Sequence, residues 1–322
     1  MHPNIRSFLF LLACTATLHQ PLLAADARPT LLRGPATRVF DVAFSKDGLR
    51  LAAAYEDGSF RIWDVATEKP LLVCESAHSN HCRSIAWAVD GQALWTTGDE
   101  GMIRGWRTDN GEPVGDAIPV EKPYQVVISS EPERLVVASR DASIHLFPLP
   151  RSAESKHVLE GHRAPVRNLA LGPNGLLASV GHDQTLKVWD LNSGRCTHSV
   201  SGEGGGRFFA VAFAPGGQHV AMAGDGGRVH FCDLQKSKVI RSWPAHEREI
   251  RSLAFSRDGR LLASAGEDVE VRVWKIPGGT LLKTLSGARA KAYCVEFSPA
   301  NATIAVGRAD GRIEIWPDIV AQ

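Results

Sequence analysis

The chain has 322 residues and a formal net charge of +1, with 44% hydrophobic and 22% charged residues. This composition is typical of a folded domain, because disordered chains carry fewer apolar residues and a larger net charge. A charge so close to zero gives no basis for bulk attraction to nucleic acid or to acidic lipid. Large β folds commonly reach this length as one domain, so we expect a single domain without a nucleic-acid partner.

Residues 1–25 differ in character from the rest of the chain. A short basic start is followed by an apolar run at 8–18 and by small residues up to Ala25, which is the pattern of a secretory signal peptide. A run of about eleven residues is too short to span a bilayer as a helix, so we expect no membrane span. The alternative is a lipoprotein, because Cys14 ends a sequence similar to a bacterial lipobox. We therefore expect 26–322 to be the mature protein, periplasmic or secreted.

Beyond these residues, one pattern of short alternating strands and turns is repeated along the chain. In its clearest copy, strands are expected at 166–171 and 176–180, followed by a tight turn at Asp183 and a third strand that ends in Trp189-Asp190. Such runs separated by turn residues indicate an antiparallel meander. The residue at the Trp189 position recurs at intervals of 43, 41, 42, 43, 42 and 42 residues, at Trp63, Trp106, Phe147, Trp189, Cys232, Trp274 and Trp316. A period of about 42 residues with Trp-Asp is typical of a four-stranded propeller blade.

The repeats resemble those of the WD-repeat β-propeller family. The residues that match the family's motif are His162, Ser179, Asp183 and Trp189 in the fourth repeat and His246, Ser264, Asp268 and Trp274 in the sixth. The second repeat is close, with Glu100 in the aspartate position, whereas the first, third, fifth and seventh are degenerate. The resemblance implies an all-β fold, a seven-bladed β-propeller of four-stranded antiparallel blades that covers roughly residues 28–320.

The last repeat has only three of its four strands before the chain ends. In the complete repeats an outer strand precedes the glycine that opens the next repeat, and residues 29–33 occupy this position before Gly34. We therefore expect an N-terminal strand at 29–33 to complete the last blade. Such closure hides the two strand edges that an open array would expose.

Ser179, His162 and Asp183 are also the residue types of a nucleophilic catalytic triad. The alternative is a structural relay, in which the indole N–H of Trp189 donates to the serine, the serine bonds the imidazole, and the aspartate holds the imidazole. The same set recurs in the sixth repeat with its own Trp274 at the same spacing. An enzyme seldom needs two copies of its active site around one ring, so we expect both tetrads to be structural and no residue to be catalytic.

Other catalytic and metal-binding motifs are absent from the sequence. There is no GxSxG, Walker loop, HExxH or CxxCH motif, and the twelve histidines show no metal-ligand spacing. The five cysteines after residue 25 are odd in number and lack a CxxC, which favours buried thiols over a disulfide scaffold. We expect neither a cofactor nor a metal.

One position is aromatic or arginine in all seven repeats. It directly follows the first apolar residue of each inner strand and is occupied by Phe40, Arg83, Tyr124, Arg167, Phe209, Arg251 and Tyr293. In the family fold these positions fall at the narrow top rim around the central channel. Arginine and tyrosine are enriched at binding hot spots, so we predict that the top face binds a partner. The alternative is that these side chains only pack between blades.

We therefore expect a monomeric, non-catalytic scaffold that presents its top face to a protein or peptide. One alternative is a propeller enzyme similar to a lactonase or a quinone-cofactor dehydrogenase, and another is a binder of small ligands or glycans at the central channel. An enzyme of this kind would need acids, a metal or a stacking Trp pair at the channel mouth. No acid pair of that register is apparent in the sequence.

Overall fold

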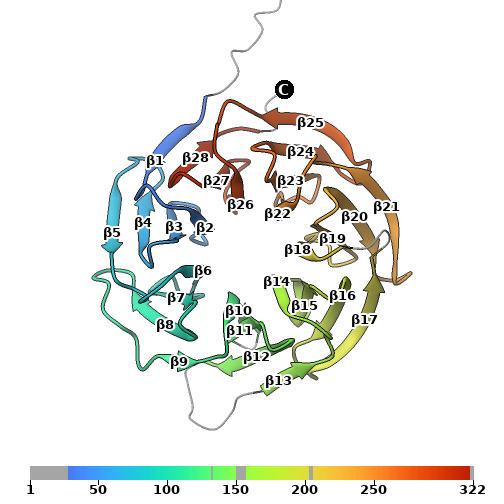
Figure 1. Cartoon of the computed structure of the whole chain (residues 1–322), viewed down its shortest axis with the longest axis horizontal. Coiled ribbons are helices and arrows are strands. Elements are labelled where there is room, and N and C mark those ends of the chain that lie inside the picture. The colour runs from blue at the N-terminus through green and yellow to red at the C-terminus, as the bar shows by residue number, and fades with distance from the viewer. Residues whose placement is uncertain (1–27, 132, 150–156, 203–205, 320–322) are drawn as a thin grey trace, which may run out of the picture.

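The computed structural model describes residues 28–131, 133–149, 157–202 and 206–319. These residues form seven four-stranded antiparallel sheets placed radially around a central channel (Figure 1). The predicted all-β, seven-bladed propeller is therefore confirmed. The signal peptide predicted at 1–25 and the lipobox cysteine Cys14 lie outside the described residues.

Each blade is a meander whose first strand lines the channel and whose fourth strand lies on the outer rim (Figure 1). Turn glycines with positive φ, such as Gly58 and Gly227, allow the tight reversals between strands. Blade 1 consists of β2 (Val39–Phe44), β3 (Arg50–Tyr55), β4 (Phe60–Asp64) and β5 (Pro70–Cys74), and blade 2 of β6 (Cys82–Trp87), β7 (Ala93–Gly98), β8 (Met102–Arg107) and β9 (Ile118–Pro119). Blade 3 consists of β10 (Pro123–Ser130), β11 (Glu133–Ser139), β12 (Ser143–Pro148) and β13 (His157–Glu160), and blade 4 of β14 (Val166–Leu171), β15 (Leu176–Gly181), β16 (Thr185–Asp190) and β17 (Arg195–Ser201). Blade 5 consists of β18 (Phe208–Phe213), β19 (His219–Gly224), β20 (Arg228–Asp233) and β21 (Lys238–Pro244), and blade 6 of β22 (Ile250–Phe255), β23 (Leu261–Gly266), β24 (Val271–Lys275) and β25 (Thr280–Leu285). A short 3-10 turn, Pro173–Gly175, joins β14 to β15.

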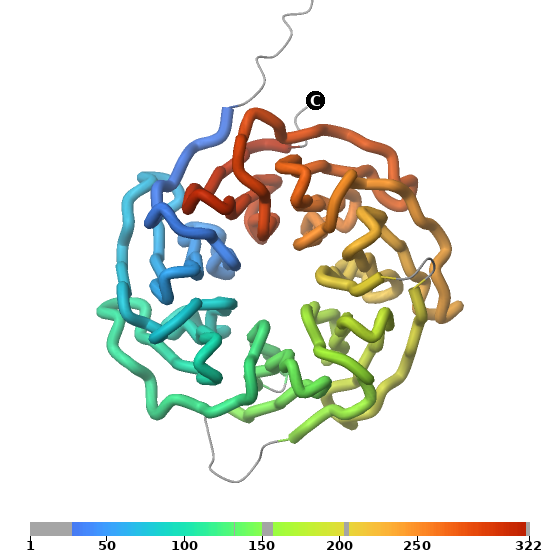
Figure 2. The backbone as a smooth tube through the Cα atoms, in the orientation of Figure 1, coloured from blue at the N-terminus to red at the C-terminus, as the bar shows by residue number. Residues whose placement is uncertain are grey.

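Blade 7 joins the two ends of the chain. It consists of β26 (Ala292–Phe297), β27 (Ile304–Arg308), β28 (Arg312–Trp316) and, as its outer strand, β1 (Thr30–Arg33). β1 pairs antiparallel with β28, from Thr30 opposite Ile315 to Arg33 opposite Arg312, and Figure 2 shows the blue and red ends of the tube side by side. The prediction that an N-terminal strand completes the last blade is therefore confirmed.

The hydrophobic core lies between neighbouring blades. Between blades 3 and 4, for example, Val136 and Ile144 from one blade pack with Val166, Leu177 and Trp189 from the next. All five side chains are at most 1% exposed. Because each blade buries both faces against its neighbours, the ring holds the inner strands in fixed positions around the channel.

The first two strands of every blade share a β-bulge at the same place. In blade 1 the register shifts between Val39 and Asp41, which leaves Phe40 without a partner on β3. The unpaired residues in the other blades are Arg83, Tyr124, Arg167, Phe209, Arg251 and Tyr293. A bulge redirects a side chain out of the regular alternation of a strand. The seven positions singled out in the sequence are therefore the seven bulged residues.

Candidate functional site at the mouth of the central channel

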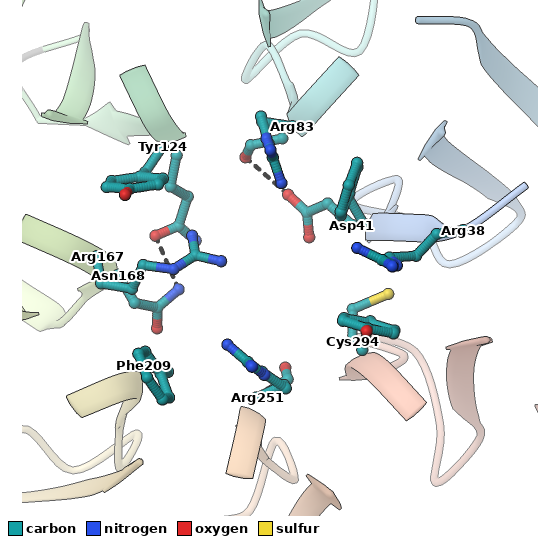
Figure 3. A pocket seen from close by; sticks show the side chains of 14 residues that line it. Arg38, Asp41, Arg83, Tyr124, Arg167, Asn168, Phe209, Arg251 and Cys294 are labelled. Carbon is teal, nitrogen blue, oxygen red and sulfur yellow. Dashed lines mark hydrogen bonds between the residues drawn. The ribbon is translucent and has the colours of Figure 1, made fainter. Parts of the chain in front are cut away.

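The seven bulged residues, which we name the rim ring, line one pocket at the end of the channel where the inner strands begin. The pocket has a volume of about 180 Å³ and is lined by Phe40, Arg83, Tyr124, Arg167, Phe209, Arg251 and Tyr293, together with Arg38 and the polar residues below them. Figure 3 shows the arginine side chains extending toward its centre. The structure thus brings together residues that are about 42 positions apart in the chain.

Arginine and aromatic side chains stack in pairs around the channel mouth, three pairs within the rim ring and a fourth in which Arg38 joins Tyr293. The guanidinium carbon lies close to the ring centroid in the pairs Arg83 on Phe40 (4.3 Å), Arg167 on Tyr124 (4.6 Å), Arg251 on Phe209 (4.6 Å) and Arg38 on Tyr293 (4.5 Å). A cation this close to an aromatic face is attracted by the ring's quadrupole. The stacking therefore restrains the arginines before any partner binds.

Two arginines of the rim ring are also paired with acids. Arg83 binds Asp99 in a bidentate manner, with Nε donating to Oδ1 at 2.7 Å and the second nitrogen donating to Oδ2 at 2.6 Å. Burial raises the pKa of Asp99, but hydrogen bonds from Arg83 and His81 outweigh burial and lower that pKa overall. Arg251 donates from Nε to Glu267 at 2.8 Å and also bonds Glu249. These two charges are therefore neutralised within the protein.

Arg167 has a different environment. The position that holds Asp99 in blade 2 is occupied in blade 4 by His182, whose ring lies 5.8 Å from that of Phe209. Burial lowers the pKa of His182, and the nearby Arg207 and Arg167 lower it further. Burial also lowers the pKa of Arg167, to about 10. Arg167 thus keeps its positive charge at neutral pH and forms no ion pair with a carboxylate of the described residues.

A belt of hydrogen bonds below the rim ring joins neighbouring inner strands. Asp41 accepts from the Ser84 hydroxyl at 2.7 Å, and Gln125 accepts from the Asn168 amide at 2.9 Å. Asn168 in turn accepts from the backbone N–H of Val211 at 2.8 Å. The sequence analysis missed this belt, although its members share one signal: they directly follow residues of the rim ring. The belt gives the pocket a polar, fixed floor.

The lower channel contains two acids that the sequence analysis also missed. Asp41 and Glu296 line a cavity of about 640 Å³ whose other walls are largely apolar. Burial raises the pKa of Asp41 to about 6 and that of Glu296 to about 8. Among the described residues, the backbone N–H of Phe44, 2.7 Å away, is the one donor to the Glu296 carboxyl. At neutral pH, Glu296 is therefore mostly protonated.

The residues of the two predicted tetrads lie in contact on the outer side of their blades. In blade 4 the Trp189 indole donates to Ser179 Oγ at 2.8 Å, His162 Nε2 lies 2.7 Å from the same oxygen, and His162 Nδ1 lies 2.8 Å from Asp183. In blade 6 the corresponding distances are 2.9, 2.7 and 2.8 Å for Trp274 to Ser264, His246 to Ser264 and His246 to Asp268. Both hydroxyls are fully buried, so no path leads from them to the channel mouth.

Blade 7 replaces this tetrad with a buried ion pair. The Trp316 indole donates to Glu314 Oε2 at 3.0 Å, and Arg308 donates to the same oxygen at 2.7 Å. Arg308 is 1% exposed. The degenerate sequence of the seventh repeat did not predict this pair, because an Arg–Glu pair is not part of the family motif.

The described residues include no group of three His, Cys, Asp or Glu side chains placed to hold a metal ion. Within the same ranges, no helix has the length and hydropathy needed to cross a bilayer.

Comparison with known proteins relates the chain to WD-repeat proteins. The model described as "WD domain, G-beta repeat" matches residues 28–64 and 153–190, and the model of the anaphase-promoting complex subunit 4 WD40 domain matches residues 220–300. Similar proteins include the WD repeat-containing protein AAC3 of Dictyostelium discoideum, 25% identical over 72% of this chain and 45% of that protein. The transcriptional corepressor LEUNIG_HOMOLOG of Arabidopsis thaliana is 26% identical over 74% of this chain and 30% of its own length. THO complex subunit 3 of the same plant is 27% identical over 61% and 63%.

These relatives overturn the predicted location of the protein. A periplasmic or secreted protein, or a lipoprotein anchored through Cys14, was expected from the first 25 residues. The relatives are mainly intracellular WD-repeat proteins, among them a THO complex subunit and an autophagy-related protein. An intracellular location of the relatives does not fit a periplasmic or secreted protein, so the predicted export is not supported. The prediction was wrong because it rested on one short apolar segment and did not consider the type of domain that follows this segment.

The chain spans 30 to 63% of the length of the first curated relatives that it matches. Those relatives are WD-repeat scaffold or regulatory proteins, so the comparison supports a protein-interaction propeller in general terms. The repeat models, the relatives and the seven closed blades together support membership of the WD40 repeat family for this chain.

Proposed function

We propose that the protein is a monomeric, non-catalytic scaffold that binds a protein or peptide at the channel mouth, through the rim ring. The observation that carries the proposal is the convergence of all seven bulged residues on one pocket. Tyr124 and Phe209 also pack against the core, but the ladder of hydrogen bonds does not require aromatic or arginine side chains at an unpaired position. A binding face gives them a common role.

The energetics of the rim favour binding. Arginine and tyrosine combine contact area with directional hydrogen bonds, which is why they recur at hot spots. Here they are held by stacking and by the hydrogen-bonded belt beneath them. Because these side chains are already ordered, little conformational entropy remains to be lost when a partner binds.

The proposal is tested by measuring partner capture with rim variants. Partners cross-linked to the full chain in extracts of the source cells are identified, and the affinity of the most enriched one is measured. We expect Phe209→Ala or Tyr293→Ala to weaken binding at least tenfold, because truncating a hot-spot residue costs about 2 kcal/mol or more. The melting temperature of Tyr293→Ala should change little, because that side chain is only half-buried, whereas Phe209→Ala should also lower it, because the Phe209 side chain is 5% exposed.

Lys187→Ala is the matched control, because Lys187 lies on β16, where its amine contacts only Ser199 among the described residues. It should bind as the wild type does. Normal binding by both rim variants together with failure of the Lys187 variant would place the interface on the side of the propeller and overturn the proposal.

A further inference from the structure

The charges around the channel mouth differ from blade to blade. Two positions face each other across the top of each blade, one before β2 and its equivalents and one in the turn after β3 and its equivalents. In three blades they hold a base and an acid: Arg38 with Glu56, His81 with Asp99, and Arg207 with Asp225. In blade 3 both positions are basic, Lys122 and Arg140, whose backbones are hydrogen-bonded at 3.3 Å. In blade 4 they are Pro165 and His182.

The acids of the mouth are already committed to other bases. Asp99 binds Arg83, Asp225 binds Arg207 at 2.9 Å, and Glu267 binds both Arg251 and Lys291. Lys122, Arg140 and Arg167 form no ion pair with a carboxylate anywhere in 28–131, 133–149, 157–202 or 206–319. The sector formed by blades 3 and 4 therefore carries uncompensated positive charge, in a protein whose overall charge is only +1.

A pocket covers this sector. It has a volume of about 440 Å³ and extends over blades 2 to 6. Its lining includes Lys122, Arg140, Arg167 and His182, and also Asp99 and Glu249, each of which is bonded to an arginine. Figure 3 shows Arg167 reaching toward the centre between Tyr124 and Phe209. The guanidinium of Arg167 lies against the Tyr124 ring, whose centroid is 4.6 Å from its carbon. A charge that is partly removed from water without a partner is unfavourable, and an incoming anion would relieve this cost.

We infer that the channel mouth recognises its partner through an acidic side chain, an aspartate or glutamate of an extended peptide, whose carboxylate binds Arg167 with Lys122 and Arg140 alongside. The planar guanidinium offers paired N–H donors that match a carboxylate. Tyr124 and Phe209 would contact the aliphatic part of the same side chain. This inference rests on the proposed function, and it adds the chemistry of the partner.

The test is a selection of random peptides displayed on phage against the immobilised full chain, run in parallel on the wild type, Arg167→Gln and Arg50→Gln. Arg50 is a matched control because it is stacked on Trp87 and donates to Gly91 at the opposite end of the channel. We expect one position of the wild-type binders to be enriched in Asp or Glu, equally so with Arg50→Gln, and the enrichment to disappear with Arg167→Gln.

A double-mutant cycle then measures the pair directly. The best peptide should bind Arg167→Gln at least tenfold more weakly than the wild type. Changing its acid to the corresponding amide should cost a similar factor with the wild type but little with the variant, because two residues in contact do not act additively. Arg167→Lys should retain part of the preference for acid, and unchanged melting temperatures show that the variants are folded.

The outcomes separate this inference from the proposed function. Peptides that require Phe209 and Tyr293 but show no preference for acid would overturn the inference and leave the proposed function standing. Peptides that bind the Phe209 and Tyr293 variants as tightly as the wild type would overturn both.

Discussion

The acids of the outer tetrads and the acids of the central channel are both buried, yet their pKa values shift in opposite directions. In blade 6, burial raises the pKa of Asp268, but hydrogen bonds from Arg272 and His246 outweigh it and lower that pKa to about 2. In the channel, burial dominates and raises the pKa of Glu296 to about 8. The difference lies in the donors: Asp268 faces two side chains that carry or can carry positive charge, whereas Glu296 receives one backbone N–H.

The comparison separates two uses of polar residues within one ring. The tetrads are closed networks, in which each buried polar group is matched within its own blade and stabilises the fold. The channel and its mouth contain groups without a charged partner among the described residues: Glu296 is mostly protonated at neutral pH, and Arg167 forms no ion pair with a carboxylate. Groups of the second kind are the ones that a ligand can satisfy.

The largest expected effect is on stability and comes from a substitution that breaks one tetrad. Trp189→Ala removes a side chain that is 1% exposed and leaves Ser179 without its indole donor. We expect the free energy of unfolding to fall by about 3–5 kcal/mol, from the cavity and the lost hydrogen bond. Urea unfolding measures this loss, and partner capture by the folded fraction should be unchanged. A loss of capture without a loss of stability would contradict the separation of the two regions.

An intermediate effect should appear on acidification. The pKa of Asp268 is lowered in the fold, so its stabilising contribution is complete above its ordinary value of 3.8 and is lost as the pH falls toward about 2. His246, whose pKa is lowered mainly by burial, acts in the same direction below its ordinary value of 6.5. Asp268→Asn should therefore be less stable than the wild type at neutral pH and lose less stability below about pH 4. Parallel curves for the two proteins in urea titrations at successive pH values would contradict this.

A third effect, at higher pH, should have the opposite sign. The pKa of Glu296 is raised from 4.5 to about 8, so the folded protein binds more protons than the unfolded chain between these values, and stability falls as the pH rises through them. Glu296→Gln keeps an acceptor for the N–H of Phe44 and removes the charge. Between pH 5 and pH 8 its melting temperature should drop less than that of the wild type, by about 2 °C or more. An equal drop would show that Glu296 ionises without cost.

Much of the fold could be predicted from the sequence because each repeat contains residues that mark a particular strand or turn of its own blade. Trp189 and Trp274 mark the third strands, Asp183 and Asp268 mark the turns, and the strand before Gly34 completes the last blade. Each of these signals lies within one blade or its immediate boundary. The predicted location was wrong because it rested on residues 1–25 alone and took no account of the WD repeats that follow them.

The candidate site was harder to predict because its interactions cross blades. The position of the rim ring is visible in the sequence, but the bulge that directs Phe40 into the channel depends on how β2 pairs with β3. The link from Asp41 to Ser84 joins residues 43 positions apart, and so does the link from Gln125 to Asn168. Such pairings follow from packing around the whole ring.

The bulge also makes the rim ring separable from the scaffold. A bulged residue gives its side chain to the pocket while the ladder continues on either side of it, as at Tyr124 between Pro123 and Gln125. The hydrogen bonds of the sheet therefore do not depend on which side chain occupies the bulge. Because these side chains stack in pairs across neighbouring blades, a propeller of this design can acquire a new specificity by a few substitutions made together in adjacent blades.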